Sequence, residues 1–255
     1  MKTPREPGPN ADGLALATEV FVRGFGFTRS FTHPFSGERV GPLWVLRDAP
    51  RKNPVDYRTE EWVATDVAPA EVDRLARAGT RGRFAICAIA SIGTDDGPLR
   101  AAYKALGYRL GGTEPLMVHD LRKIPRRTSP AVIERVRTIA QAERLAKAAR
   151  SRQILPEHLG AAAPLRAYVA TIDGEISGWV RSVAGTAGTW CSNMYVEPPH
   201  RRQGIASALL ARMLRDDRAH GAPRAVLLAS HTGAKLYITL GYRQLGTLLL
   251  FTPKR

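Results

Sequence analysis

Short continuous apolar runs alternate along the chain with segments in which apolar residues recur every three or four positions. The two patterns predict an order of strands and helices. Short apolar runs between Gly, Pro and acidic residues predict strands over 60–69, 84–90, 189–196 and 225–230, with a hairpin over 165–183. The Asp173-Gly174 pair is the turn signal of that hairpin. Apolar residues at three- and four-residue spacing predict helices over 70–79, over 207–215 and before Gly241. This alternation is typical of a mixed α/β fold.

The segment between the strand over 189–196 and the next helix carries the clearest chemical signal. Pro198 and Pro199 end the strand, and 201–206 runs directly into the helical pattern. The first N–H groups of a helix have no partner within it, and the helix dipole makes that end positive. Gly204 lets an anion approach the backbone, and two arginines add charge. The pattern predicts an anion site; the alternative is an ordinary turn with a solvated basic surface.

The spacing Arg201-x-x-Gly204-x-Ala206 resembles the pyrophosphate loop of the GNAT acyltransferase superfamily. The resemblance implies that acetyl-CoA is the acyl donor and that the preceding strand pairs with its pantetheine arm. It also implies that this strand places a backbone N–H near the acyl carbonyl, where an oxyanion develops. The residues that the resemblance assigns to the donor are Met194, Tyr195, Val196, Arg201, Arg202, Gln203, Gly204, Ile205, Ala206, Ser230 and Tyr237.

A second motif of the same family lies downstream. Tyr237, Gly241 and Tyr242 match the family's helix of the form Ala-x-x-x-Tyr-x-x-x-Gly-Phe/Tyr, although Gly233 stands at the Ala position. The resemblance implies that Tyr237 is the catalytic residue that protonates the departing thiolate of CoA. The alternative is that Tyr237 packs in the core with neighbouring leucines, as a tyrosine in a helix often does.

Part of this pattern occurs twice. Segment 99–121 reads like segment 233–255, and five of the seven residues over 103–109 recur over 237–243. The alternative is two unrelated helix ends that share a Leu-Gly-Tyr sequence. Together with the resemblance, the repeat predicts two tandem GNAT-like domains. Each is a mixed, mostly antiparallel twisted sheet flanked by helices, and its fourth and fifth strands splay apart.

The first copy lacks the loop. Its predicted strand passes at once into the helix over 70–79, and Asp66 and Glu71 stand where phosphates would bind. We therefore expect Tyr103 to be structural and only the second copy to hold a donor. The predicted boundaries are a disordered tail over 1–18, a degenerate GNAT-like domain over 19–121, a linker over 122–130 and a catalytic GNAT domain over 131–255.

Composition adds limits to this interpretation. The chain has 255 residues, which suffices for two modest domains. Its two cysteines, Cys87 and Cys191, fall in predicted strands, which argues against a disulfide framework and for a reducing compartment. We find no apolar leader and no apolar run of membrane-spanning length, so a cytoplasmic location without membrane contact is expected. The spacing of potential ligands predicts no metal site.

The net charge of +15 is concentrated partly over 122–152. In this stretch Ser129 and Pro130 predict the N-cap and first residue of a basic helix over 131–151. Such a surface is either solvated or docks a polyanion. Nucleic acid is not favoured, because no aromatic row for base stacking accompanies the charge.

The expected reaction is direct transfer of acetyl from acetyl-CoA to a primary amine. His231 and Glu197 are candidates for the general base, and the alternative is loss of the amine proton through water. Other functions left open are acetylation of a macromolecule, such as a protein or tRNA, and a non-catalytic module that binds CoA or nucleic acid. We expect a monomer that is a pseudo-dimer, or a homodimer.

Overall fold

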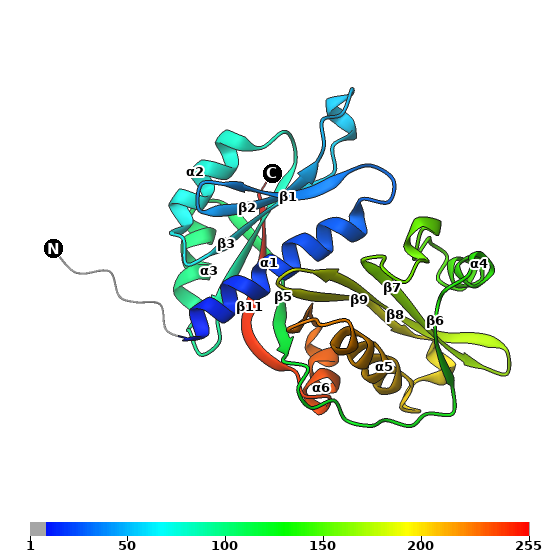
Figure 1. Ribbon diagram of the computed structural model, residues 1–255. Helices are drawn as coiled ribbons and strands as arrows, with labels where there is room; N and C mark the ends of the chain where they lie inside the picture. Colours follow the sequence, from blue (N-terminus) through cyan, green and yellow to red (C-terminus); the bar gives the residue numbers. More distant parts are fainter. Residues whose placement is uncertain (1–8, 255) are drawn as a thin grey trace. The chain divides into compact units, whose positions relative to one another are not determined.

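The structure is a computed structural model that describes residues 9–254 (Figure 1). Two compact units divide these residues: unit 1 comprises 9–117, 228–234 and 244–254, and unit 2 comprises 118–227 and 235–243. Each unit contains strands of a mixed sheet and flanking helices, as the sequence predicts. Among the described residues, none of the helices combines the length and the apolar character that crossing a membrane requires.

Unit 1 contains a mixed sheet and three α-helices. Its strands, in spatial order, are β1 (Phe35–Val40), β2 (Leu43–Asp48), β3 (Glu60–Thr65), β4 (Phe84–Ser91), β11 (Arg243–Pro253) and β5 (Tyr108–His119). Its helices are α1 (Pro9–Arg29), α2 (Pro69–Gly79) and α3 (Gly97–Ala105), with a 3₁₀ turn η1 over Pro54–Asp56. Val118 and His119 at the end of β5, and Arg243 at the start of β11, belong to unit 2.

Unit 2 has the same kind of architecture. Its strands, in spatial order, are β10 (Ala225–Leu228, whose last residue belongs to unit 1), β9 (Gly188–Val196), β8 (Glu175–Gly185), β7 (Leu165–Ile172) and β6 (Val132–Arg135). Its helices are α4 (Ile139–Ala148), α5 (Ile205–Ala219) and the second part of α6 (His231–Thr239), with 3₁₀ turns η2 (Pro156–His158) and η3 (Pro198–His200).

The sequence repeat corresponds to a repeat in strand pairing. β1–β2 and β2–β3 are antiparallel and β3–β4 is parallel; likewise, β7–β8 and β8–β9 are antiparallel and β9–β10 is parallel. A helix connects each parallel pair, α2 in the first half and α5 in the second. The compact units nevertheless do not follow the repeat, because β11 pairs antiparallel with β4 and so completes the sheet of unit 1.

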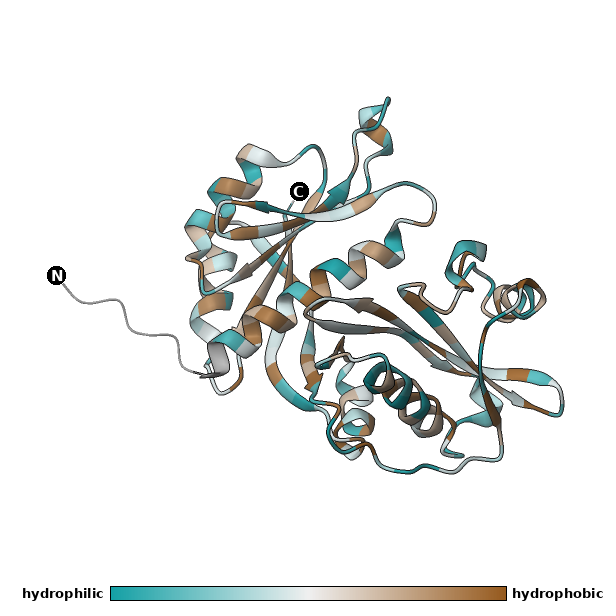
Figure 2. Ribbon diagram, in the orientation of Figure 1, coloured by the Kyte–Doolittle hydropathy of each residue, from teal (hydrophilic) through white to brown (hydrophobic). Residues whose placement is uncertain are grey.

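Each half buries an apolar core between its sheet and its helices. In unit 1 the largest fully buried side chains include Trp62, Tyr103 and Tyr108. In unit 2, α5 buries Leu209 and Leu214, among others, against its sheet. Figure 2 shows apolar residues along the strands and hydrophilic residues in many of the connecting loops. These cores fix the positions of the strand ends. The candidate site begins at the ends of β9 and β10 in unit 2.

The predicted disordered tail over 1–18 is wrong for residues 9–18, which are the start of α1. Leu14, Ala17 and Phe21 are buried along one side of this helix, at a spacing that forms an apolar stripe. The burial of this stripe outweighs the Pro- and Gly-rich composition that suggested disorder. The prediction for residues 1–8 lies outside the described residues.

The predicted basic helix over 131–151 is wrong in its first part. Residues Val132–Arg135 form β6, which pairs antiparallel with β7, and α4 begins at Ile139. The N-cap is Thr138 rather than Ser129, because Thr138 and Gln141 form a capping box with N···O distances of 3.2 Å in both directions. The β-branched residues before it suit a strand better than a helix.

Candidate active site

The gap between β9 and β10 is the first feature of the candidate site. The two strands pair only at Thr189–Ala225 and Trp190–Val226. β9 continues to Val196 with no further pair to β10 among the described residues, so the predicted splay of the fourth and fifth strands is confirmed in the second copy. In the first copy the same prediction is wrong, because β3 and β4 pair at every position from Glu60–Phe84 to Thr65–Ile89. Unpaired N–H and C=O groups along a strand form a template on which an extended ligand can add hydrogen bonds.

A β-bulge interrupts β9 at the mouth of this gap. Arg181 pairs with Ser192, but Trp179 pairs with Tyr195, so β9 carries one more residue than β8 between these pairs. Within the bulge Asn193 has a left-handed backbone with φ of 53°. A bulge leaves backbone groups unpaired and redirects the strand. The apolar pattern of β9 does not predict the bulge; an Asn inside an apolar strand is its only local signal, because Asn tolerates this conformation.

The loop that follows β9 leaves the start of α5 open. Gly204 is the N-cap with φ of 79°, and a Cβ at this position would lie 3.0 Å from the backbone oxygen of Thr128. The first helical bond runs from the N–H of Ala208 to the carbonyl of Gly204. Within the described chain no side chain caps this N-terminus, so the N–H groups over 205–207 have no partner in the helix. This geometry suits a pyrophosphate.

The two loop arginines have different environments. The Nε of Arg201 donates to the carbonyl oxygen of Val196 at 3.0 Å, and its guanidinium lies 5.7 Å from the Tyr195 ring. Arg201 therefore fastens the loop to the end of β9. Arg202 is exposed and has φ of 65°, so its charge faces solvent at the loop. The side chain of Gln203 donates to the carbonyl of Pro199 at 3.3 Å, which also stabilises the turn.

Tyr237 lies on α6 and is buried, with 9% of its surface exposed. Its ring contacts Tyr242 edge to face, with centroids 5.6 Å apart, and no described residue forms a hydrogen bond with its hydroxyl group. Burial raises the pKa of Tyr237, and the neighbouring Cys191 raises it further. The phenol therefore keeps its proton at neutral pH, as a proton donor must. Gly241 ends this segment with φ of 99°, as expected for a residue that follows a helix.

The remaining predicted residues lie in two places. Glu197 precedes η3 in unit 2, and the Tyr195 hydroxyl donates to its Oε2 at 3.5 Å. Ser230 and His231 belong to unit 1, whereas all the other predicted site residues belong to unit 2. The Ser230 hydroxyl oxygen accepts from the N–H of Gly233 at 3.0 Å, and His231 Nε2 lies 2.8 Å from the hydroxyl oxygen of Thr113.

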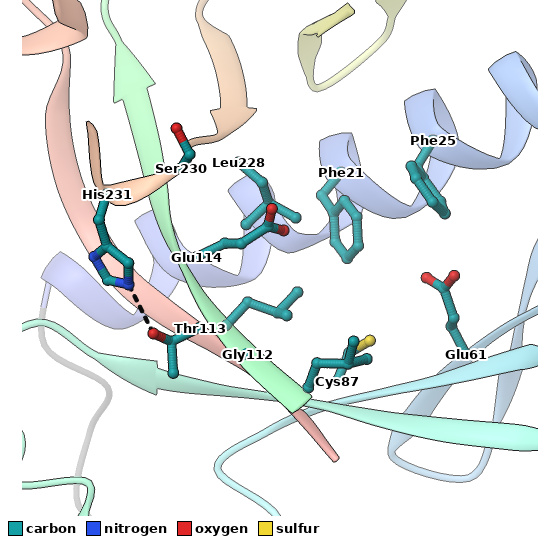
Figure 3. Close-up of a pocket in the computed structure, with 12 residues that line it drawn as sticks. Phe21, Phe25, Glu61, Cys87, Gly112, Thr113, Glu114, Leu228, Ser230 and His231 are labelled. Carbon is teal, nitrogen blue, oxygen red and sulfur yellow. Dashed lines mark hydrogen bonds between the residues drawn. The ribbon is translucent and has the colours of Figure 1, made fainter. Parts of the chain in front are cut away.

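Ser230 and His231 line a cavity of about 450 Å³ within unit 1 (Figure 3). One wall is α1, which contributes Phe21 and Phe25. Another is the sheet: Cys87 of β4 pairs with Leu250 of β11, so both side chains point to this face. The cavity is largely apolar, and its polar groups come from strand positions and from the start of α6.

Two carboxylates enter this cavity, Glu61 from β3 and Glu114 from β5 (Figure 3). Burial raises the pKa of Glu61, and the opposing effect comes from Arg29, whose Nη1 donates to Oε1 at 2.7 Å. Burial also raises the pKa of Glu114, which the nearby His231 lowers in part. No described side chain forms a hydrogen bond or an ion pair with Glu114. Neither residue is predicted as a site residue from the sequence; an acid within a strand is the only local signal of each.

Comparison with known proteins finds a family match for part of the chain. Residues 163–244 match the family model described as acetyltransferase (GNAT) domain, and no curated protein matches the sequence. A GCN5-related N-acetyltransferase from Kribbella flavida is similar in structure, with a TM-score of 0.64 and 17% identity over 94% of this chain and 96% of that one.

Two further solved structures are similar. The GCN5-related N-acetyltransferase from Sphaerobacter thermophilus has a TM-score of 0.57 and 17% identity, over 82% of this chain and 76% of that one. A tandem GNAT protein from the clavulanic acid biosynthesis pathway has a TM-score of 0.53 and 17% identity, over 84% of this chain and 80% of that one. At these identities the structures show a shared fold. The resemblance seen in the loop and the tyrosine helix is confirmed for the second half of the chain: residues 163–244 match the GNAT acetyltransferase domain, and the described chain shares its fold with GNAT structures.

Proposed function

We propose that the protein is an acyl-CoA-dependent N-acyltransferase that moves acetyl from acetyl-CoA to a primary amine. The observation that carries this proposal is the separation of β9 from β10 directly before the uncapped start of α5. A free strand edge and an open helix N-terminus are the two features that a pantetheine arm and a pyrophosphate require. Both occur in the part of the chain that matches the acetyltransferase model.

The donor would be held by backbone groups more than by side chains. The edge of β9 over 194–196 offers hydrogen bonds to the amides of the pantetheine arm. The N–H groups over 205–207 and the charge of Arg202 would bind the pyrophosphate, and Gly204 leaves room for it. The bulge at Asn193 supports an oxyanion role for the N–H of Met194, since bulged strands carry unpaired N–H groups.

The proposed reaction is direct transfer. The amine nitrogen attacks the thioester carbonyl carbon, the new C–N bond forms, and the C–S bond breaks. Tyr237 gives its proton to the departing sulfur, and its raised pKa keeps that proton available until the sulfur bears charge. The amine proton leaves to water or to a base, for which Glu197 and His231 are the candidates. No covalent bond to the protein is needed.

The test combines binding with turnover. Calorimetry should show acetyl-CoA binding, and release of the CoA thiol should appear with at least one member of a broad panel of primary amines. Failure of acetyl-CoA to bind would overturn the proposal. Normal binding without thiol release from any amine would favour the alternatives, a macromolecular acceptor such as a protein or tRNA, or a non-catalytic CoA-binding module.

A further inference from the structure

We propose that the cavity in unit 1 is a binding site for a primary ammonium ion with an apolar body, with Glu114 as the ion partner of the ammonium. This inference goes beyond the proposed acyl transfer, because it assigns a ligand class to a cavity that lies within unit 1 alone. Glu114 and most of the other cavity residues lie outside the matched residues 163–244, whereas Leu228, Ser230 and His231 lie within them. The chemistry of the cavity itself, rather than the family, carries the argument.

The walls of the cavity favour an apolar ligand of small-molecule size. A volume of about 450 Å³ lies within the range of small-molecule sites. Phe21 and Phe25 contact each other with ring centroids 5.6 Å apart, and Leu248 and Leu250 lie on the sheet opposite them. Burial of an apolar body against such walls contributes binding energy roughly in proportion to the area removed from water.

The charges of the cavity favour a cation. Arg29 already pairs with Glu61, and its guanidinium also lies 5.2 Å from the Phe25 ring, so the charge of Glu61 is balanced within the protein. Glu114 has no such partner among the described residues. The groups near it are the His231 ring, which is held by Thr113, the carboxylate of Glu61, which is paired with Arg29, the thiol of Cys87, and apolar side chains. A bound ammonium would compensate the partly desolvated carboxylate, whereas a neutral or acidic ligand would not.

The first test is ligand discrimination by the full-length protein, measured by calorimetry without acetyl-CoA. The probe is 4-phenylbutylamine, and its matched controls are the neutral 4-phenylbutanol and the anionic 4-phenylbutyrate. We expect the amine to bind at least about 10-fold more tightly than either control, since a hydrogen bond to a charged group adds that much. Equal affinities, or no binding of the amine, would overturn the inference while normal acetyl-CoA binding kept the proposed function intact.

The second test uses variants. Glu114→Gln should weaken binding of the amine at least about 10-fold and leave binding of the alcohol unchanged, because only the charge is removed. Glu143→Gln, which removes an exposed carboxylate of α4, is the matched control and should change neither. Leu250→Trp should weaken both ligands by filling the cavity, with acetyl-CoA affinity unchanged. Unaltered amine binding in Glu114→Gln would refute the assignment of Glu114, and unaltered binding in a folded Leu250→Trp protein would refute the cavity.

Discussion

The two halves of the chain pair their strands in the same order, but they differ at the parallel pair. In the first half β3 and β4 pair at six consecutive positions, from Glu60–Phe84 to Thr65–Ile89. In the second half β9 and β10 pair at two positions and then separate, and a bulge bends β9 beyond that point. The same topology thus gives a closed sheet in one half and an open strand edge in the other. Only the open edge can accept an extended ligand.

The helices that follow these strands differ in the same sense. α5 begins after a left-handed Gly204 with no side-chain cap, whereas α2 begins with Pro69, which has no N–H to offer. In the first turn of α2, Glu71 is paired with Arg74. A second cavity of about 370 Å³ beside this helix is lined by Asp66, Asp95 and Asp96, whose charge opposes a phosphate. Anion binding therefore depends on these local features and is not a property of the shared topology.

The largest expected effect concerns the two helix starts. Gly204→Glu should lower acetyl-CoA affinity at least about 1,000-fold, because it adds a Cβ at positive φ, a contact with Thr128 and a repelling charge. Ala68→Glu adds the same charge at the exposed N-cap of α2, without the backbone strain, and should leave the affinity unchanged. Calorimetric titration of both variants measures the contrast. Equal losses would show that the first half also holds the donor, and unchanged affinity in Gly204→Glu would refute the loop assignment.

The second effect concerns how each helix is anchored. Asp217 of α5 is fully buried, and its carboxylate accepts from Arg166 at 2.6 Å, from Ser182 at 2.7 Å and from Thr189 at 2.9 Å. Asp217→Ala would leave Arg166 buried without its partner and should lower the free energy of unfolding by about 3 kcal/mol or more.

The matched variant in the first half is Glu71→Ala, which removes an exposed ion pair of α2 and should change stability little. Chemical denaturation of both variants makes the measurement. If Asp217→Ala were no more destabilising than Glu71→Ala, the buried pair would not be what holds α5 against its sheet.

The features of the two halves that can be predicted from the sequence are turns, helix ends and caps, because a few neighbouring residues specify each of them. Gly204 and Gly241 both have positive φ, and the hairpin turn at Asp173-Gly174 has φ of 48° and 82°. Such positions are readable because few residues tolerate that backbone conformation. Capping is also local: Thr138 and Gln141 form a capping box at a spacing that is visible in the sequence, whereas the predicted N-cap at Ser129 is wrong.

The remaining features depend on contacts between distant segments. The pairing of β11 with β4 joins residues far apart in the chain, and no turn or cap specifies it. The cavity brings Glu61, Glu114 and His231 together from two strands and a helix, so none of them stands out in a local window. The length of a parallel pair, six positions or two, also has no local signature, because both strands of each pair are apolar.

The third prediction concerns the proposed acid. Tyr237→Phe should lower kcat about 100-fold and leave acetyl-CoA affinity nearly unchanged, because it removes the proton donor and keeps the ring against Tyr242. Steady-state thiol release and calorimetric titration give the two values. A collapse of affinity together with a lower melting temperature would assign Tyr237 to packing instead. Unchanged kcat would show that the thiolate leaves without its help.

The smallest effect is expected at the aligned tyrosine of the first half. Tyr103 is fully buried, stacks on Phe251 with centroids 4.4 Å apart, and contacts Tyr108 edge to face. Its hydroxyl is buried without a hydrogen-bond partner among the described residues. Tyr103→Phe therefore removes an unsatisfied polar group and keeps the ring, so the melting temperature should stay the same or rise slightly, and kcat should not change. A loss of turnover comparable to that of Tyr237→Phe would mean that both copies of the repeat take part in the reaction. The assignment of catalysis to the second half alone would then be wrong.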